Sequence, residues 1–479
     1  MTGSLVPPWV LAAGGLVVFV LGALRGRRPG PSSQLLFAVA LGAAVGAGVA
    51  AVFPVPGSAG TWSFLDSGPY GRFFTALLCG VTALTLLFAK AYAERRDFAG
   101  DELYGLVLWG CLGMVLTASA THWLALFLGY ELLSLCLYVL IALRRAGALS
   151  GEAALKYFFP GAVTSAFLVF GIALLYASEG TLDMAGTVAF ARPWVLLGLS
   201  CVVVGLAFKL SFVPFHLWAA DVYEGAPAPV TAFLASGSKL AVFAALLRLA
   251  VVSGAEVRAA AAPALGVIAL LTVVVGNVGA LTQPNAKRLL AYSSIAQMGY
   301  LLLALLGVRA GGAAAAVFYG SVYALMDLGA FGVVGALSPA ERAEDLGALD
   351  ELRGLGHARP WPAAALVVCL VSLAGLPPTG GFVGKVAVFL AVFRAGFPVL
   401  GLLALLATVP AAFLYLRLAV AVYRPADAVT GAPISAPRAH PSEVLASGVV
   451  VVLLLGLGLA PSAWLSAIGA ALAALPPGP

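Results

Sequence analysis

Three lysines lie inside long apolar stretches of this 479-residue sequence, at Lys209, Lys239 and Lys385. A charge at the centre of a membrane-spanning helix costs on the order of 2.5–3.5 kcal/mol on insertion scales, so such residues usually serve a function. Elsewhere the chain prefers arginine, with only six lysines beside twenty arginines. A buried amine can release its proton near neutral pH, whereas a guanidinium keeps it. We therefore expect these lysines to form a proton relay.

Glu131 is the carboxylate best placed to balance one of these charges, in the middle of the apolar run LALFLGYELLSLCLYVL. An isolated buried carboxylate would become neutral, so an ionised Glu131 needs a cation close by. We expect that cation to be Lys209. The alternative for Glu131 is a structural hydrogen bond between helices, and the alternative for the lysines is a purely structural role.

Further polar residues repeat at helical spacing in the second half of the chain. They share two helical faces, with Ser293, Gln297 and Tyr300 on the first and Tyr319, Tyr323 and Asp327 on the second. Such stripes either hold a file of water or join neighbouring helices by hydrogen bonds. We favour the water file, with Asp327 as its strongest member because its carboxyl lies in an apolar run.

Residues at the edges of the apolar runs have a weaker claim to the relay. His122 and His216 lie at expected span ends and could carry protons, although a single histidine more often caps or packs. Lys156 begins its span, so its amine could instead extend to the membrane surface. Asp221 and Glu224 are expected to line a solvated vestibule.

The composition identifies the molecule that must position these groups as an integral membrane protein. Hydrophobic residues make up 62% of the chain, charged residues 10%, and the mean hydropathy is +1.05. The apolar runs are continuous and about 20 residues long, which is typical of helices and excludes the alternating pattern of a β-barrel. The net charge of +6 comes from arginines scattered in short loops, so nucleic-acid binding is excluded.

About fourteen spans are expected. They lie near 5–24, 35–54, 72–90, 104–120, 122–143, 157–177, 194–218, 228–250, 263–281, 289–307, 313–336, 361–395, 397–423 and 444–472. The remaining residues form loops that are too short for a soluble catalytic domain. Any redox chemistry must therefore belong to partner proteins.

Loop charges predict the orientation in the membrane. Loops that follow odd-numbered spans hold 15 Lys and Arg residues, and loops that follow even-numbered spans hold 5. Because cytoplasmic loops are enriched in these residues, both termini are expected on the outer side.

Proline and glycine interrupt two of the spans. The breaks are expected near 208–218, in FKLSFVPFHLW, and near 375–385, in GLPPTGGFVGK. Freed backbone groups survive in a membrane only where protein or water satisfies them, so broken helices mark transport paths. The five cysteines lie in apolar runs without CxxC spacing, so we expect no metal or iron–sulfur site in this chain.

Several longer segments resemble the proton-translocating, antiporter-like membrane subunits of respiratory complex I, the NADH:quinone oxidoreductase. The strings are DVYEGAPAPVTAFL, KRLLAYSSIAQMGY, EAALKYFFPGAVTSAFLVFGIALLYASEGT and GLPPTGGFVGK, and the matches cover most of residues 120–400. Within the family the N-type pattern is nearest, because M-type subunits typically have Glu at the position of Lys385. L-type subunits carry a long C-terminal extension that does not follow Pro479 here.

The resemblance implies that Glu131, Lys209, Lys239 and Lys385 form the axis of protonatable residues, with Gln297, Asp327, His216, Tyr300 and Lys156 as further relay or water-anchoring positions. It implies an all-α membrane protein of about 14 helices with two inverted five-helix repeats. The expected division is a three-helix segment over 1–100, repeats over 101–255 and 256–425, and a final helix over 426–479.

The same resemblance implies a subunit of a bacterial inner-membrane translocase that binds no cofactor itself. NADH, FMN, iron–sulfur clusters and quinone would be bound by partner subunits, and other membrane subunits would be its neighbours. The alternative is a subunit of a multisubunit cation/proton antiporter, and a third reading is an assembly scaffold.

The sequence departs from the family pattern at three positions. The family tends to have His, Asn and Pro where this chain has Gln297, Asp327 and Ala220. The first two departures bear on the group that links Lys239 to Lys385. Gln297 is expected to anchor water, and Asp327 to be the titrating substitute.

Overall fold

A computed structural model of the chain describes residues 6–25, 32–53, 64–96, 100–144, 148–339, 344–425 and 440–476. Within these ranges the chain is almost entirely helical, and extended residues meet only in isolated bridges. This agrees with the expected all-α membrane fold.

Thirteen helical segments of the described chain are long and apolar enough to cross a membrane, judged by length and composition. They are α1 (Val6–Arg25), α2 (Ser32–Val52), α3 (Pro69–Arg95), α4 (Gly100–Ser119), α5 (Trp123–Ala142), α6 (Ala148–Glu179), α8 (Pro193–Leu210), α10 with η1 and α11 (Ala228–Phe233, Leu234–Ser238, Lys239–Val252), α12 (Ala255–Leu281), α13 (Ala286–Leu306), η2 with α14 (Val308–Gly312, Ala313–Leu337), α18 with α19 (Pro398–Leu406, Val409–Tyr423) and α20 (Pro441–Leu459). Shorter helices complete the described chain: α7 (Met184–Thr187), α9 (Trp218–Gly225), η3 (Leu349–Leu352), α15 (Leu355–Ala358), α16 (Pro360–Ala374), α17 (Gly380–Arg394) and α21 (Ser462–Ala473).

Both expected helix breaks are present. The first lies between the end of α8 at Leu210 and the start of α9 at Trp218. The second divides the expected span 361–395 into α16 and α17, which explains why thirteen rather than fourteen uninterrupted spans are found.

The last expected span, 444–472, was wrong as a single helix. Helix α20 ends at Leu459, and α21 begins at Ser462 after Pro461. Proline lacks the N–H that a continuous helix needs and favours the first turn of a new one.

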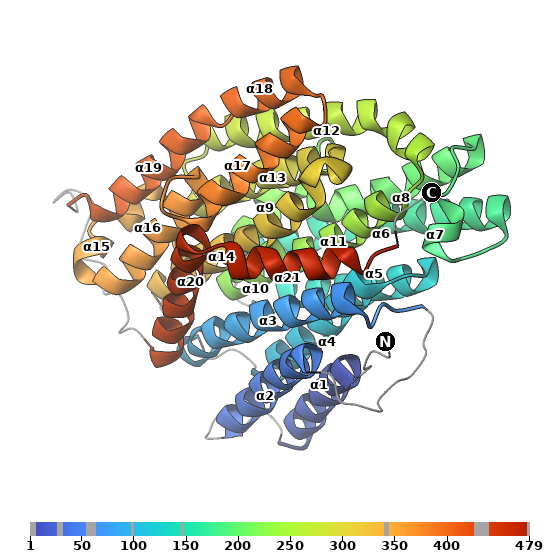
Figure 1. Cartoon of the computed structure of the whole chain (residues 1–479). Coiled ribbons are helices and arrows are strands. Elements are labelled where there is room, and N and C mark those ends of the chain that lie inside the picture. Colours follow the sequence, from blue (N-terminus) through green and yellow to red (C-terminus); the bar gives the residue numbers. More distant parts are fainter. Residues whose placement is uncertain are drawn as a thin grey trace.

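The central helices form the core of the bundle. Figure 1 shows α10, α11, α13 and α14 in the middle, with α1 and α2 at one edge and α18 and α19 at the opposite edge. In an 18-residue apolar window of each of the spans Ala228–Val252 and Val308–Leu337 every residue is buried, whereas in Pro398–Tyr423 only 28% of such a window is. Groups on the central helices are therefore shielded from lipid.

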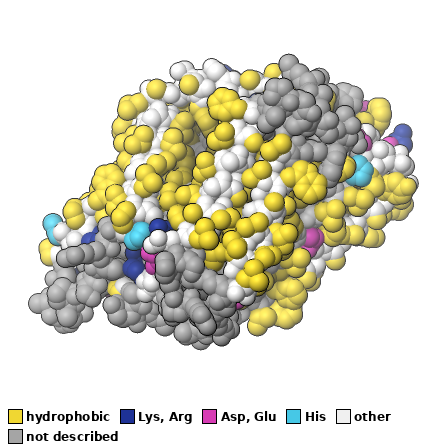
Figure 2. All heavy atoms as spheres, turned by 90° about the horizontal axis from the view of Figure 1, so that it is seen from below, with side chains coloured by type: hydrophobic (Ala, Val, Ile, Leu, Met, Phe, Trp, Pro, Cys, Tyr) yellow, Lys and Arg dark blue, Asp and Glu magenta, His cyan; other side chains and the backbone are white. Residues whose placement is uncertain are grey.

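The outer surface is apolar. Figure 2 shows one face covered largely by hydrophobic side chains, with few charged groups among them. Large side chains such as Trp9, Leu24, Val399 and Phe413 are exposed. A contiguous surface of this kind suits contact with lipid tails or with other membrane subunits.

Candidate functional site

Lys209 lies at the first helix break. It occupies the last turn of α8, which ends where Ser211 adopts a left-handed conformation with φ of 57°. The last carbonyls of a helix carry partial negative charge, which favours an ammonium there. The side chain is 1% exposed, and Nζ donates to the hydroxyl of Tyr157 at 3.2 Å and lies 4.7 Å from the ring centroid of Tyr130. The ammonium of Lys209 is therefore in contact with aromatic side chains.

Glu131 lies on α5, one residue after Tyr130, and is half-buried. Its Oε1 accepts a hydrogen bond from Ser165 on α6. Among the described contacts Glu131 and Lys209 form no direct ion pair, although the charge of Glu131 acts on Lys209, so Lys209 as the cation near Glu131 stays a prediction. The two groups instead contact the same helix, α6, through Ser165 and Tyr157.

Lys239 follows a wide helical turn. The π-helical turn η1 comes directly before it, and Lys239 begins α11 with 0% exposure. Its Nζ donates to Ser294 Oγ on α13 at 2.7 Å and lies 5.4 Å from the ring centroid of Tyr223. A π-turn shifts the register of a helix and is frequent at functional sites. Here it turns the amine toward the polar face of α13.

A chain of hydroxyls continues from Lys239. Ser294 Oγ and the Tyr323 hydroxyl are 2.6 Å apart, and the Tyr323 hydroxyl donates to the carbonyl of Ala235 at 2.8 Å. Because Tyr323 donates to that carbonyl, Ser294 is left to donate to Tyr323 and to accept from Lys239. These groups form an oriented chain of hydrogen bonds that begins at Lys239 and ends at the Ala235 carbonyl.

Asp327 lies one helical turn beyond Tyr323 on α14 and is 0% exposed. Neither carboxyl oxygen has a hydrogen-bond partner in the described chain. The carboxyl of Asp327 and the amine of Lys239 interact electrostatically. Asp327 is therefore a buried polar group whose charge acts on Lys239.

Lys385 lies at the second break. Its Nζ donates to the carbonyl oxygens of Leu373 at 2.7 Å and Ala374 at 3.2 Å, the last two residues of α16. Gly375 follows with φ of +79°, and a Cβ there would approach Lys385 Cδ to 2.7 Å. Glycine is therefore required both for the turn and for the close approach of the lysine. The broken helix supplies the oxygens that hold the ammonium.

Gln297 joins α13 to the second break. Its Nε2 donates to the Tyr415 hydroxyl at 3.1 Å and to the Leu373 carbonyl at 3.5 Å, and its Oε1 accepts from Tyr319. Tyr415 in turn lies 2.5 Å from Ser293 Oγ. Three of the four hydrogen-bonding positions of the amide are therefore filled.

Tyr300 has a different partner from the rest of its stripe. Its hydroxyl accepts from Asn277 Nδ2 at 2.9 Å, and its ring centroid lies 5.3 Å from Lys385 Nζ. Together the polar faces of α13 and α14 lead from Lys239 toward Lys385. Between the Ser294–Tyr323 pair and the Gln297–Tyr319 pair no direct hydrogen bond is formed in the described chain, so the polar row is interrupted there.

Two expected positions lie away from this buried row. The side chain of Lys156 is 44% exposed and pairs with Glu152 at 2.6 Å and Asp221 at 2.7 Å, as the surface alternative predicted. Asp221 and Glu224 also pair with Arg288, at 2.6 and 2.8 Å. These residues form a charged patch rather than part of the row.

The two histidines also stand apart from the row. His216 lies half-buried between α8 and α9, and its Nδ1 has no hydrogen-bond partner among the described residues. His122 precedes α5 at the N-cap position, but its side chain makes no capping hydrogen bond.

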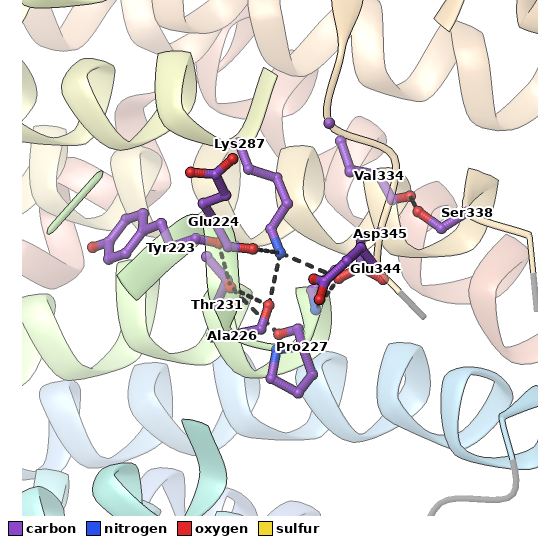
Figure 3. Close-up of polar contacts among 12 residues, drawn as sticks. Tyr223, Glu224, Ala226, Pro227, Thr231, Lys287, Val334, Ser338, Glu344 and Asp345 are labelled. Atoms are coloured by element: carbon purple, nitrogen blue, oxygen red, sulfur yellow. Dashed lines mark hydrogen bonds and ion pairs between the residues drawn. The ribbon is translucent and has the colours of Figure 1, made fainter. Parts of the chain in front are cut away.

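A buried ion network, not predicted from the sequence, lies at the end of the bundle where α13 begins. Lys287 is expected among the loop charges, yet this residue is 1% exposed. Figure 3 shows its side chain directed at the carbonyls of Glu224 and Ala226 and at Asp345. The Nζ distances are 2.9, 2.7 and 3.2 Å. The one sequence signal was the choice of Lys where this chain favours Arg.

Asp345 is the centre of that network and is 0% exposed. It pairs with Arg96 at 3.2 Å and Arg144 at 3.0 Å, and accepts from the Tyr92 hydroxyl and the Ala228 N–H. Burial alone would raise the pKa of the Asp345 carboxyl, but the charges of Lys287, Arg144 and Arg96 lower it to about 2. It therefore stays ionised at physiological pH and serves to fix helix ends.

Comparison with known proteins gives consistent matches along the whole chain. The sequence profile of a family described as NADH:quinone oxidoreductase/Mrp antiporter, TM, matches residues 120–410. A relative named NADH-quinone oxidoreductase subunit N 1, from Solidesulfovibrio magneticus, is 47% identical over 469 residues, which are 97% of this chain and 97% of the relative.

Solved structures match in fold as well. A chain in the structure of respiratory complex I from Thermus thermophilus with bound aureothin has a TM-score of 0.80 and 36% identity, covering 97% of this chain and 99% of that chain. A chain of the Mrp complex from Dietzia sp. has a TM-score of 0.82 and covers 98% of this chain and 97% of that chain. At 24% identity the second match shows likeness of fold alone.

Proposed function

The chain belongs to the NADH:quinone oxidoreductase/Mrp antiporter family of membrane proteins, and from that premise we propose that it is the N-type, proton-translocating membrane subunit of a complex I-type NADH:quinone oxidoreductase. Within it, Glu131, Lys209, Lys239 and Lys385 carry the protons. NADH, FMN, iron–sulfur clusters and quinone are assigned to partner subunits. In the described part of this chain no group of His, Cys, Asp and Glu residues could hold a metal ion.

One contrast among buried lysines carries the proposal. Lys209, Lys239 and Lys385 are held by hydroxyls, backbone carbonyls and ring faces, and none forms an ion pair with a described carboxylate. Lys287, by comparison, is paired with Asp345. An ammonium held by neutral oxygens can lose its proton without leaving an unpaired carboxylate behind, so the first three suit transfer and the fourth suits structure.

The transfer is driven from the Glu131 end. Quinone reduction in a partner subunit would move or neutralise the charge on Glu131, and Lys209 would then lose a stabilising interaction. Its proton would pass by the first break to Lys239, and then along Ser294, Tyr323 and the α13–α14 face toward Lys385. Release outward works against about 2.3 kcal/mol per charge for each 100 mV of membrane potential.

Asp327 gives the middle step a group that can titrate. Its carboxylate influences Lys239 and lies on the same helix as Tyr319, which bonds Gln297. Gln297 anchors water or orients Tyr319 without carrying charge itself. Where the family usually has His and Asn, this chain has Gln297 and Asp327. The titrating group is then the carboxylate of Asp327, and the amide of Gln297 is the neutral partner.

Isolation of the chain with its partners tests this function. A tagged chain should copurify with flavin- and iron–sulfur-containing subunits that oxidise NADH. Copurification with small hydrophobic subunits alone, together with cation/proton exchange in vesicles, would support the antiporter alternative, which the Mrp fold likeness keeps open. Retention of pumping after removal of all three relay lysines would instead indicate a scaffold.

Orientation and internal repeats complete the proposal. Both termini are placed on the outer side by the 15 to 5 loop bias. Residues 101–255 and 256–425 are proposed as inverted repeats, each with one broken helix beside a relay lysine. Labelling of single cysteines in intact cells with an impermeant reagent tests the orientation, and protection of an N-terminal tag would contradict it.

A further inference from the structure

An apolar cavity of about 490 Å³ lies between α8, α11, α12 and the turn after α13. Leucine and valine side chains dominate its wall, including Leu199, Val203, Leu246, Leu249, Leu265 and Leu305. Its size falls in the range of ligand-binding cavities in proteins, roughly 300–1,000 Å³. None of these residues belongs to the relay described above.

Two arginines line the same cavity. Arg258 lies in the first turn of α12, and Arg309 lies in the turn η2 that follows α13. Arg258 donates to the Ser253 carbonyl, and Arg309 Nη2 donates to the Val251 carbonyl at 3.0 Å. Both guanidiniums therefore gather where α11 ends and α12 begins, at the ends of membrane-spanning helices. That is the depth at which lipid headgroups lie.

The two positive charges have no counter-charge within the described chain. Neither arginine forms an ion pair there, and the exposed Glu256, two residues before Arg258, pairs with neither. Their charges act on each other unfavourably. Other arginines are paired, such as Arg192 with Glu179 at 3.3 Å. A guanidinium has five N–H donors, and each of these two uses one in the described contacts.

We propose that this cavity binds an anionic phospholipid, with an acyl chain between the leucines and the phosphate on Arg258 and Arg309. Guanidinium groups bind phosphate oxygens in a fork that matches their geometry, and the bound phosphate would remove the repulsion between the two charges. An uncharged lipid would fill the cavity without using the arginines. A free phosphate ion would use the arginines without the apolar wall, so a molecule with both parts fits best.

Photochemical labelling of the intact, purified complex tests the site. The probes are phosphatidylglycerol and phosphatidylcholine, each with a photoreactive group at the end of one acyl chain. At subsaturating concentration, phosphatidylglycerol should label the peptides that contain Leu249, Leu265 and Leu305 in preference to phosphatidylcholine. Each basic residue at the membrane surface adds about fivefold to affinity for anionic lipid, so the double variant R258Q/R309Q should label about 30-fold less.

Control variants separate the lipid from other occupants. Arg192→Gln alters an arginine outside the cavity and should leave labelling unchanged, whereas Ala262→Phe adds bulk to the cavity wall and should abolish it. Equal labelling by both lipids, or unchanged labelling of R258Q/R309Q, would overturn the proposal. So would absence of lipid labelling together with cross-linking of a partner subunit to a photoreactive residue at position 265. If Ala262→Phe does not assemble, the comparison of the two probes and the double variant still decides.

Discussion

Gln297 and Lys385 donate to the same acceptor, the carbonyl oxygen of Leu373, at 3.5 and 2.7 Å. That carbonyl is free because α16 ends one residue later at the second helix break. Gln297 also holds Tyr319 and Tyr415. The amide therefore links the α13–α14 face to the last lysine of the relay without carrying a charge.

Replacement of Gln297 tests whether this link conducts. Gln297→Leu leaves the Tyr319 hydroxyl without its acceptor, at a cost of about 1–3 kcal/mol for this unpaired buried group, and it dries the path. Tyr415 loses the amide but keeps Ser293. We expect proton uptake to fall several-fold, whereas Gln297→His should retain most of it. Proton uptake into membrane vesicles, measured beside the quinone reductase rate, checks both. Wild-type coupling in Gln297→Leu would mean that the path runs elsewhere.

Asp327→Asn tests the proposed titrating group. The change preserves shape but removes the charge that acts on Lys239, so pumping should fall more than it does in Gln297→His. The same vesicle assay applies, with assembly checked by native electrophoresis. The exposed Asp350 pairs with Arg353, three residues further along the chain, and provides the matched change, since Asp350→Asn should pump normally. Equal pumping by both variants would remove Asp327 from the relay.

Glu131 and Lys209 should behave as one unit although they do not touch. Both contact α6, Glu131 through Ser165 and Lys209 through Tyr157. A change at one residue therefore alters the position of the helix that contacts the other. We expect the losses caused by Glu131→Gln and Lys209→Ala to combine less than additively, with a coupling of roughly 0.5–3 kcal/mol in a double-mutant cycle. If the changes in free energy calculated from the pumping rates of the single variants add exactly in the double variant, the two groups do not communicate.

Asp345→Asn should impair assembly rather than proton transfer. It leaves Lys287, Arg96 and Arg144 buried around a neutral group, and breaking a buried ion network costs roughly 3–5 kcal/mol. Thermal unfolding of the purified complex should show the loss, while the protons moved per electron in the surviving fraction stay unchanged. Unchanged stability with altered coupling would reverse this assignment.

The pH dependence of that network has a defined sign. The pKa of Asp345 in the folded chain is about 2, below its ordinary value of 3.8. Its contribution to stability is therefore fully present above about pH 4 and is lost as the pH falls toward 2. Wild type and Asp345→Asn should converge in stability only in that acid range, and convergence near pH 6 would contradict the assignment.

The sequence predicted what depends on local chemistry. Proline and glycine located both helix breaks, and lysines within apolar runs predicted three buried amines, because each feature is costly in a membrane unless it is used. Contacts between distant segments were out of reach. The aromatic groups around Lys209 come from α5 and α6. The carboxylate that pairs with Lys287 belongs to Asp345, 58 residues further along the chain. No helical periodicity contains that information.

The side chains that contact Lys209 directly could not be predicted for a related reason. Spacing along one helix shows which face a residue occupies, but not which side chain from another helix comes between. Here Tyr130 and Tyr157 lie against the ammonium. The division of the last span at Pro461 was visible in the sequence, yet continuous hydrophobicity outweighed it.

Lys385→Arg tests the central claim most directly. Arginine keeps the positive charge and can still bond the carbonyls of Leu373 and Ala374, but it does not release its proton. The measurement is NADH-driven proton uptake into inverted vesicles per electron transferred, with the exposed Lys156→Arg as the control. The relay predicts that Lys385→Arg assembles but loses proton uptake while Lys156→Arg retains it; full wild-type coupling in Lys385→Arg would contradict the relay.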